Sequence, residues 1–415
     1  MANWQGFYKL SWQERLQRTI ENKNLTADQA ALITQHYDMV GEQQVENYLY
    51  NFGVPTGLLL ELPVDGRLVT VPMSTEEPSV IAAANNGARM MRAGAGVQTV
   101  IESRLVRGQI ILDNVADVVA LQTYVETHLT QLLQVANDAH PSMAKRGGGA
   151  KALTVEVLDA QTAIVNVLVD PKAAMGANVV NTMSEAIASV LRQAGYEVLM
   201  AILSNFATES LVKAKVAVPV TALATKQGMS GADVATKIAA ASRIETLSPY
   251  RAVTSNKGML NGIEAAVLAS GNDTRAVNAA LHAYAAQGGQ YHGLTRWTVQ
   301  GDELLGETTL PLILGVVGGS IGIVPAVKLN HALMDNPTVN ELTSTIAAVG
   351  LAQNLAAIRA LVSTGIQAGH MALQAKSLAL QVGATPAEVP ALTAALQQAG
   401  KFNEATAREL LAKLR

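Results

Sequence analysis

The sequence contains no cysteine among its 415 residues. That absence excludes a disulfide framework, a zinc site built on thiolates and a cysteine nucleophile. None of the seven histidines lies in an HExxH motif or in another spacing typical of metal ligands, so we expect no metal site. Aromatic residues are also scarce, at 4%, which argues against a surface that stacks nucleic-acid bases.

Charge is the second scarcity. Lys, Arg, Asp and Glu together make up 15% of the chain, against about 25% in an ordinary soluble protein. The net charge is −3 and no run of Lys or Arg exceeds two residues, so we expect neither a nucleic-acid partner nor a polybasic membrane anchor. Apolar residues, at 49%, are enough for a large core, and a surface this poor in charge suggests that a second copy of the chain covers part of it.

The sequence carries no pattern typical of a targeting or membrane segment. Residues 1–6 have neither the charged stretch nor the apolar stretch of a secretory signal peptide. The segment 308–327 is uncharged over 20 residues, about the length that crosses a bilayer, but it contains two prolines and four glycines. We interpret it as a buried segment bent at its glycines, and we expect a soluble, cytoplasmic protein.

Local patterns predict helices and a hairpin at the start of the chain. The hairpin turns at Asp65-Gly66, and Pro72 indicates that its second strand lies at a sheet edge. The expected elements are two helices that begin at the capping-box patterns 11–14 and 26–29, strands 58–62 and 68–73, and a helix from about 78 to 92.

From about residue 105 the pattern becomes typical of a split β-α-β unit. Because the unit is self-contained, we expect a small domain inserted into a larger one. Its expected elements, in the order β-α-β-β-α-β, are strand 107–112, helix 114–136, strands 154–158 and 163–169, helix 178–193 and strand 197–203.

The larger domain resumes near residue 211 and is predicted to be mainly helical. Its expected elements are helices 231–243, 262–270 and 274–286, a second hairpin around Gly301-Asp302, and nearly continuous helix after residue 337. The predicted fold class is therefore α+β, a mainly helical body with small sheets and an inserted ferredoxin-like unit. The predicted boundaries are 1–104 with 209–365 for the body, 105–208 for the inserted domain and 366–415 for a C-terminal helical unit.

Two glycine-rich segments could hold phosphate. Gly94-Ala95-Gly96 resembles the start of a GxGxxG loop, but position 99 is Thr and the segment follows a helix, so we interpret it as a structural turn. Gly147-Gly148-Gly149 follows Lys145-Arg146 and precedes a strand. Exposed amides beside two cations could hold a phosphate, and a flexible connection explains the segment equally well.

Several polar residues could act in catalysis, although each has a structural explanation of its own. Glu77 lies at an expected helix start, where a carboxylate compensates the helix dipole. Lys257 lies in a polar segment that we expect to be a loop between helices. Asp273 fits a helix cap, and His370 stands out only because it follows a glycine near the start of an apolar helix.

Taken together, these residues belong to a specific set of motifs. In chain order the set comprises Glu77-Pro78-Ser79, Ala174-Met175-Gly176-Ala177-Asn178, Asn181-Thr182-Met183, Tyr250-Arg251-Ala252, Asn256-Lys257-Gly258, Asn261-Gly262-Ile263, Gly271-Asn272-Asp273 and Gly369-His370-Met371. The set resembles the soluble, bacterial class II type of 3-hydroxy-3-methylglutaryl-coenzyme A (HMG-CoA) reductase, over nearly the whole chain.

The resemblance implies a four-electron reduction of (S)-HMG-CoA to mevalonate and free CoA by two nicotinamide cofactors. The reaction would pass through mevaldyl-CoA and mevaldehyde, in the mevalonate pathway of isoprenoid synthesis. The implied catalytic residues are Glu77, Lys257, Asp273 and His370. Lys257 would stabilise the oxyanion at the thioester carbonyl, and His370 would protonate the departing CoA thiolate. Glu77 would donate the proton of the second reduction, and Asp273 would hold Lys257 and Glu77 in one hydrogen-bonded network.

The resemblance also implies binding residues. Ser79 and Arg251 match positions that hold the free carboxylate of the substrate, and Asn261 is expected beside the substrate or the cofactor. The expected cofactor contacts are His140, Ser142, Lys145, Arg146, Met175, Gly176, Asn178 and Asn205.

The cofactor region departs from the family in one respect and carries a specificity signal in another. The family commonly reads Asp-Ala-Met-Gly, whereas this chain has no Asp beside the Met175-Gly176 pair. His140, Ser142, Lys145 and Arg146 suit a 2′-phosphate, so we predict NADPH, with NADH as the alternative hydride donor.

The implied assembly is a homodimer or a higher assembly with active sites at the subunit interface. A C-terminal flap, residues 366–415, would carry His370 and hinge at Gly365 and Gly369. One alternative function is NAD-dependent oxidation of mevalonate to HMG-CoA in catabolism, and a second is a homologue that binds acyl-CoA without turnover. A thiolase or HMG-CoA synthase is excluded, because those enzymes need a cysteine nucleophile.

Overall fold

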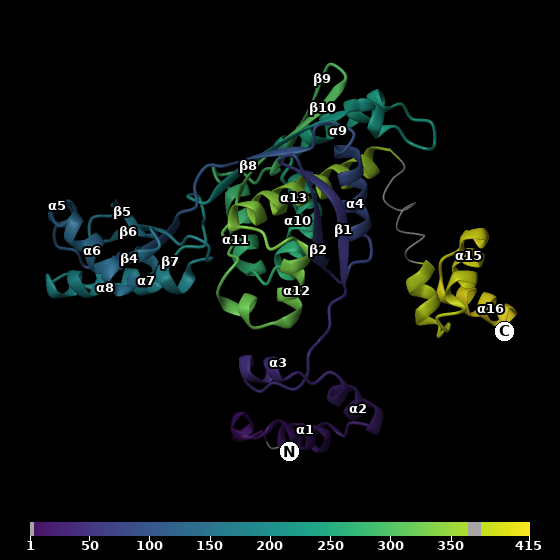
Figure 1. The fold of residues 1–415 in the computed structure, drawn as a ribbon, viewed down its shortest axis with the longest axis horizontal. Helices are drawn as coiled ribbons and strands as arrows, with labels where there is room; N and C mark the ends of the chain where they lie inside the picture. The colour runs from purple at the N-terminus through teal and green to yellow at the C-terminus, as the bar shows by residue number, and fades with distance from the viewer. Residues whose placement is uncertain (1–3, 364–374) are drawn as a thin grey trace.

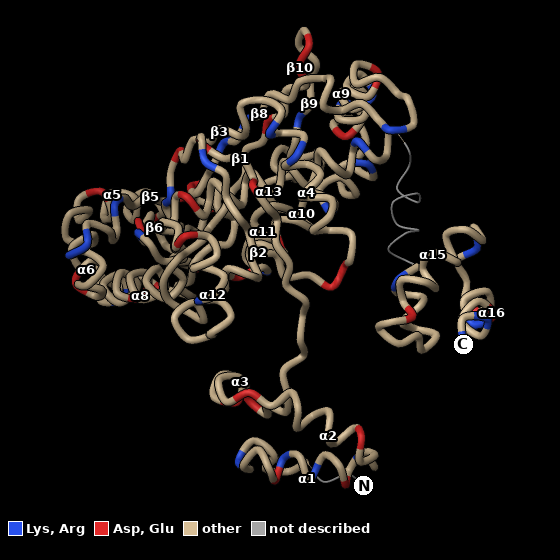
Figure 2. Tube along the Cα trace, turned by 45° about the vertical axis from the view of Figure 1, so that its right-hand side comes forward, with Lys and Arg blue, Asp and Glu red and all other residues tan. Residues whose placement is uncertain are grey.

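The computed structural model describes residues 4–363 and 375–415 (Figure 1). Its architecture is mixed α and β, with one sheet of six strands and one of four, in agreement with the predicted combination of helices and small sheets. Charged side chains of both signs are scattered along the described chain between long uncharged stretches (Figure 2). Stability therefore comes mainly from apolar burial, which two large buried clusters provide, one beside each sheet.

The six-stranded sheet joins the two predicted hairpins into one layer. The first hairpin turns at Asp65-Gly66, where both φ angles are positive, as a two-residue hairpin turn requires. Its second strand lies at the sheet edge, as Pro72 indicated, and the second hairpin turns at Gly301-Asp302. The strands are β1 (Thr56–Val64), β2 (Arg67–Ser74), β3 (Val97–Ile101), β8 (Leu211–Pro219), β9 (Thr295–Gln300) and β10 (Glu303–Pro311), in the order β2-β1-β3-β8-β10-β9.

Strands β3 and β8, which connect the hairpins, are missing from the predicted elements. The signal in β8 is an alternation of buried apolar residues with the exposed Lys213 and Lys215. The glycines before β3 serve packing, since a Cβ atom on Gly94 would stand 2.3 Å from the carbonyl oxygen of Ala217. This close approach confirms that Gly94-Ala95-Gly96 is a structural turn.

Helix α13 runs through the core of the larger body, and other helices pack around it (Figure 1). Every residue from Leu342 to Ala356 is buried, and a Cβ atom on Gly87 of α4 would stand 2.0 Å from the Ala352 carbonyl oxygen. By length and composition α13 could cross a membrane, but 72% of its most apolar window is buried in the protein, as in a core helix. The helices of this body are α4 (Val80–Met91), α9 (Gly231–Leu247), α10 (Pro249–Ala269), α11 (Thr274–Ala285), α12 (Pro325–Leu333) and α13 (Val339–Val362).

The prediction of a loop around Lys257 is wrong. Residues 249–269 form the single helix α10, and Lys257 lies near its middle. The polar residues that suggested a loop have partners across the helix surface. Asn256 is buried, donates to the carbonyl of His292 and accepts from the amide of Leu294. A polar stretch inside this helix thus reflects contacts to a neighbouring segment rather than a break.

The smaller lobe follows the predicted β-α-β-β-α-β order and lies to one side of the body (Figure 1). Its antiparallel sheet has the order β5-β6-β4-β7. The expected helix 114–136 is instead two helices that meet at His128, and Asp117 caps the first. The elements are β4 (Val106–Leu112), α5 (Val118–Thr127), α6 (Leu129–Ala139), α7 (Pro141–Lys145), β5 (Gly149–Val157), β6 (Ala163–Asp170), α8 (Ala177–Gln193) and β7 (Val198–Leu203).

The chain enters and leaves this lobe at one place. Strands β3 and β8, which precede and follow it, pair antiparallel with Ile101 opposite Val212. The amide of Glu102 donates to the carbonyl of Leu211 at 2.9 Å, just before the two segments part. The lobe is thus an insertion between two neighbouring strands of the larger sheet.

The uncharged segment 308–327 fits the predicted buried, glycine-bent segment only in its first half. Residues 310–315 are buried, whereas 317–319 are exposed. A 3₁₀ turn, Gly319–Gly322, then leads to α12 at Pro325.

Two small helical units lie at the ends of the chain, apart from the body (Figure 1). Both predicted capping boxes at the N-terminus form, at Ser11 and at Thr26. Each unit has a small core of its own. The elements are a 3₁₀ turn (Phe7–Lys9), α1 (Trp12–Lys23), α2 (Ala27–Gln35) and α3 (Met39–Gln44), and, after the helical residues 375–381, α15 (Val389–Ala399) and α16 (Glu404–Leu414).

Candidate active site

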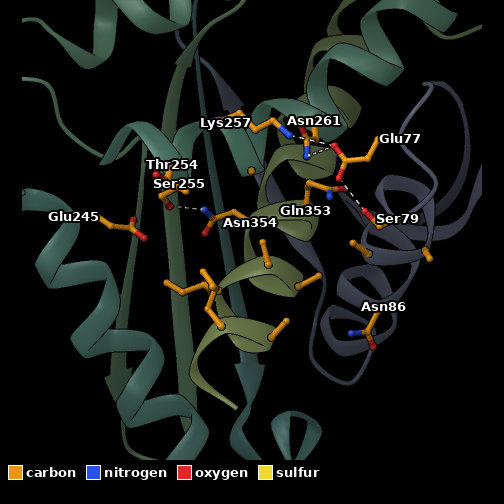
Figure 3. A pocket seen from close by; sticks show the side chains of 18 of the residues that line it. Glu77, Ser79, Asn86, Glu245, Thr254, Ser255, Lys257, Asn261, Gln353 and Asn354 are labelled. Atoms are coloured by element: carbon orange, nitrogen blue, oxygen red, sulfur yellow. Dashed lines mark hydrogen bonds and ion pairs between the residues drawn. The ribbon is translucent and has the colours of Figure 1, made fainter. Parts of the chain in front are cut away.

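A cavity of about 570 Å³ lies between the start of α4, the end of α9, and helices α10 and α13 (Figure 3). Five of the residues singled out from the sequence line it: Glu77, Ser79, Arg251, Lys257 and Asn261. We call this space the first cavity.

Three side chains converge on the carboxylate of Glu77 (Figure 3). The Lys257 Nζ lies 3.1 Å from Glu77 Oε2, and the Asn261 amide donates to the same oxygen at 3.5 Å. The Ser79 hydroxyl donates to Oε1 at 2.9 Å. Lys257 and Asn261 are four residues apart on α10 and so lie on one face. The fold thus brings together residues 180 positions apart in the sequence.

The ion pair of Glu77 and Lys257 is open to a ligand. The Lys257 side chain is 64% exposed and that of Glu77 is 32% exposed. An ion pair this exposed contributes only about 0–1 kcal/mol to stability. Its place in a cavity is therefore better explained by chemistry than by folding.

Arg251 lines the same cavity near the start of α10 and is half-buried. Within residues 4–363 and 375–415, no side chain or carbonyl forms a hydrogen bond or an ion pair with its guanidinium group. A guanidinium group offers five donors in a planar fork that suits a carboxylate. The arrangement leaves those donors available to an anionic ligand.

The first cavity is also lined by polar residues that were not predicted, among them Glu245, Ser255, Gln353 and Asn354. Glu245 is only 4% exposed, and burial raises its pKa to about 7, although the Ser255 hydroxyl and the Arg251 charge act to lower it. A signal for it was present in the sequence, because Glu245 continues the stripe of buried residues formed by Val234, Ile238 and Ser242 on α9.

A second cavity, of about 550 Å³, lies at the N-terminus of α8. Met175, Gly176, Asn178 and Asp273 line it, with the glycine-rich segment 317–321. Gly176 precedes α8 with φ of 106°, and no side chain caps the helix, so its first amides can bind an anion. Four predicted residues are thus gathered here, three of them expected cofactor contacts.

Asp273 lies in this second cavity and not beside Glu77. Its carboxylate caps α11, accepting from the amides of Arg275 at 2.9 Å and Ala276 at 3.1 Å. The helix-cap prediction is confirmed. Within the described part of the chain, no hydrogen bond links Asp273 to Lys257 or Glu77, so the expected network of the three is not assembled in one copy of the chain.

The segment that lacks the family's Asp is fixed by backbone contacts. The amide of Val316 donates to the carbonyl of Ala173 at 2.8 Å, and Ala174 bridges to Val317. A Cβ atom on Gly315 would stand 2.4 Å from the Met175 amide nitrogen. Main-chain packing thus holds the Met-Gly turn in place without a carboxylate at its start.

The triple glycine has structural reasons and is also surrounded by cations. A Cβ atom on Gly148 would stand 2.6 Å from the carbonyl oxygen of Asp170, which explains the glycine by packing. Lys151 donates to the carbonyl of Gly147 at 3.0 Å, and Lys172 lies beside the same glycine. Four predicted contacts lie on and around α7, at its exposed surface, namely His140, Ser142, Lys145 and Arg146. The segment could therefore hold a phosphate group.

One further predicted residue lies in neither cavity. Asn205 is exposed in the connection between β7 and β8. His370, with the expected hinge glycines 365 and 369, lies outside the described residues.

Comparison with known proteins identifies the family. The model of the hydroxymethylglutaryl-coenzyme A reductase family matches residues 11–375. The 3-hydroxy-3-methylglutaryl-coenzyme A reductase of Archaeoglobus fulgidus is 38% identical over 417 aligned residues, which cover 99% of this chain and 94% of that protein. A probable reductase of the same name from Borreliella burgdorferi is 34% identical over 340 residues, 80% of this chain and 77% of that protein.

Solved structures agree with this result. A 3-hydroxy-3-methylglutaryl-coenzyme A reductase from Streptococcus pneumoniae superposes with a TM-score of 0.77 and is 43% identical, covering 100% of both chains. The class II enzyme of that organism, bound to NADPH in open conformations, gives a TM-score of 0.76 at 43% identity, over 98% of this chain and 100% of the other.

Proposed function

The chain belongs to the hydroxymethylglutaryl-coenzyme A reductase family, and on that premise we propose that it reduces (S)-HMG-CoA to mevalonate and CoA. Each turnover consumes two NADPH and two protons, through mevaldyl-CoA and mevaldehyde, and serves isoprenoid synthesis in the cytoplasm. The observation that carries the proposal is the exposed ion pair of Lys257 and Glu77, in a cavity that also holds the available guanidinium group of Arg251.

Lys257 is the residue that stabilises the oxyanion in this proposal. Bound NADPH supplies the hydride for each reduction, and charge then develops on the carbonyl oxygen of the substrate. An ammonium group already fixed at the reacting carbon stabilises that charge, typically by 10²–10³-fold in rate or about 3–4 kcal/mol. The hydrogen bond from Lys257 to Glu77 holds the ammonium group in position.

Glu77 moves a proton in this proposal. It touches Lys257 directly, so after Lys257 gives a proton to the product alkoxide, Glu77 can take up a proton from solvent and pass it to the neutral amine across their 3.1 Å contact. The Ser79 hydroxyl and the Asn261 amide hold the carboxyl group in one orientation.

The remaining residues are assigned to the binding of the substrate and of the cofactor. Arg251, with Ser79, binds the free carboxylate of the HMG group. The N-terminus of α8 at Met175, Gly176 and Asn178 suits the pyrophosphate of NADPH. The cationic segment of the lobe 105–208 binds the 2′-phosphate of NADPH in this proposal, through His140, Ser142, Lys145 and Arg146. Asn205 is a further contact.

Asp273 and His370 complete the catalytic set, and they favour a homodimer. Asp273 lines a different cavity from Lys257, so it can act with Lys257 only where the two cavities face one another. An active site at the interface of two copies, closed by the flap 366–415 that carries His370, meets that requirement. The body, 1–104 with 209–365, would then supply the substrate cavity and the dimer contact.

Cofactor absorbance tests the proposal. We expect the purified chain to oxidise two NADPH for each HMG-CoA, more efficiently than NADH, and Lys257→Ala to abolish this activity. Lys237→Ala, an exposed lysine of α9 outside the cavity, is the matched control and should retain full activity. A folded wild type that binds HMG-CoA without oxidising either cofactor would instead support a non-catalytic homologue. Higher efficiency with NAD, mevalonate and CoA than with NADPH and HMG-CoA would support the catabolic direction.

A further inference from the structure

Glu245 and Arg251 line the same cavity, and neither belongs to an ion pair with any described residue. Glu245 is 4% exposed, and its Oε2 atom is buried without a hydrogen-bond partner. A buried polar atom without a partner costs about 1–3 kcal/mol, so this group needs an explanation. The cavity also holds the Arg251 guanidinium group, which has no hydrogen-bond partner in the described chain and whose charge acts to lower the pKa of Glu245.

A chain of polar side chains leads to Ser255, on the same side of the cavity as Glu245 (Figure 3). The Trp297 indole donates to Asn354 Oδ1 at 2.7 Å, and the Asn354 amide donates to the Ser255 hydroxyl at 3.2 Å. Because that hydroxyl oxygen already accepts from Asn354, its own proton remains available, and the Ser255 hydroxyl acts to lower the pKa of Glu245. Glu245, Ser255 and Asn354 lie together on one side of the cavity, away from Glu77 and Ser79 (Figure 3).

Arg251 is the one cation whose charge acts on Glu245 among the described residues of the packed elements. On α10, Lys257 is paired with Glu77. On α13, Arg359 donates to the carbonyls of Leu223 and Ala224, and on β9 the side chain of Arg296 is exposed. Arg243, on α9 itself, is exposed as well.

We propose that Glu245 is a positioning residue that sets how strongly Arg251 binds the substrate carboxylate. Uncharged Glu245 leaves the whole charge of Arg251 to the ligand, whereas charged Glu245 competes for it and repels the incoming carboxylate. The inference rests on the proposed function, which assigns the substrate carboxylate to Arg251.

Linkage makes this competition visible as a dependence on pH. Burial raises the pKa of Glu245 to about 7, so the group changes charge near neutrality. A bound carboxylate adds negative charge nearby and raises that pKa further, which means that binding takes up a proton. If the ligand raises the pKa by about one unit, the affinity falls about tenfold as the pH rises through this range.

The experiment measures HMG-CoA affinity by calorimetry, without cofactor, between about pH 6 and about pH 8.5, a range that brackets the change of charge. We expect the wild type to lose about tenfold in affinity across this range and to take up protons near pH 7. Glu245→Gln keeps the volume and the polarity of the side chain but cannot ionise, so it should bind with a nearly constant affinity. Glu264→Gln, an exposed residue of α10, is the matched control and should follow the wild type. CoA alone, which lacks the carboxylate, should respond to pH equally in all three proteins.

Two outcomes separate this inference from the proposed function. If Glu245→Gln retains the pH dependence of the wild type while Arg251→Gln weakens binding, the role of Glu245 is wrong and the assignment of Arg251 stands. If Arg251→Gln leaves the affinity for HMG-CoA unchanged, the assignment of the carboxylate to Arg251 fails first.

Discussion

Glu77 and Glu245 line one cavity, and their surroundings differ in every respect that matters for a carboxyl group. Glu77 is 32% exposed and accepts from a lysine, an amide and a hydroxyl. Glu245 is 4% exposed, and one of its oxygens has no partner. The same side chain is thus placed once where three donors, one of them a cation, hold it, and once where burial favours the neutral form. We infer from this difference that the cavity has a reactive end at Glu77 and a binding end at Glu245, each with its own acid.

The largest effect that would test this comparison is expected at the reactive end. Lys257→Ala removes the only cation that contacts Glu77 among the described residues, and with it the stabilisation of the oxyanion. We expect kcat/KM for HMG-CoA to fall about 10³-fold or more, with a change in the free energy of unfolding below about 1 kcal/mol, because the pair is exposed. Steady-state kinetics with a chemical unfolding curve measures both. Retained activity would show that the reactive end lies elsewhere.

The second test compares the two acids directly. Glu77→Gln keeps the shape but cannot move a proton, so we expect kcat to fall about 10²–10⁴-fold. Glu245→Gln should change kcat by less than about threefold, because the comparison assigns it to binding, and general acid–base losses are far larger. Equal losses of kcat in the two variants would contradict the assignment of proton transfer to Glu77 and of binding to Glu245.

The third test concerns stability. The pKa of Glu245 is raised in the folded chain from its usual 4.5 to about 7, so the folded state binds more protons than the unfolded state between these values. Stability therefore falls as the pH rises through this window, and Glu245→Gln removes the fall. Above about pH 7 we expect the free energy of unfolding of Glu245→Gln to exceed that of the wild type by about 1–3 kcal/mol. Near pH 4 we expect the two free energies to agree. Chemical unfolding at several pH values measures this, and a constant difference at all pH values would contradict it.

The smallest expected effect is a shift in the pH dependence of HMG-CoA binding when Ser255, near Glu245, is replaced. The Ser255 hydroxyl acts to lower the pKa of Glu245, so Ser255→Ala should raise that pKa. The pH at which HMG-CoA affinity declines should then move upward by less than about one unit. Thr254→Val, on the adjacent exposed position of α10, is the control and should leave the pH profile unchanged. A downward shift in Ser255→Ala would show that Ser255 does not hold Glu245 by the hydroxyl.

Local patterns predicted the parts of the fold that depend on local chemistry. The Asp65-Gly66 turn, the capping boxes and the alternation of β4 to β7 arise within short windows, and these elements formed where expected. Strands β3 and β8 were missed because their role, joining two hairpins, depends on segments more than 100 residues apart. The prediction placed a loop inside helix α10 because Asn256 and Lys257 are polar. These two residues are polar because they bond to residues of other segments.

The site was predictable as a set of residues and not as a geometry. The motif order pointed to Glu77, Lys257 and Arg251, which the fold gathers in one cavity. It could not show that Asp273 lines another cavity, because that depends on how the lobe meets the body. Glu245 carries no motif, and only its position on the buried stripe of α9 distinguishes it.

The pairing of β3 with β8 has a consequence for how such a protein can change over generations. Since Ile101 lies opposite Val212, a short turn between these strands would close the larger sheet with the whole lobe removed. The lobe is therefore a separate unit inserted at one point of the larger sheet, between β3 and β8. If the lobe binds the cofactor as proposed, substitutions within it can alter the choice of nicotinamide cofactor, while Glu77, Lys257 and Glu245, which lie outside the lobe, keep their cavity unchanged.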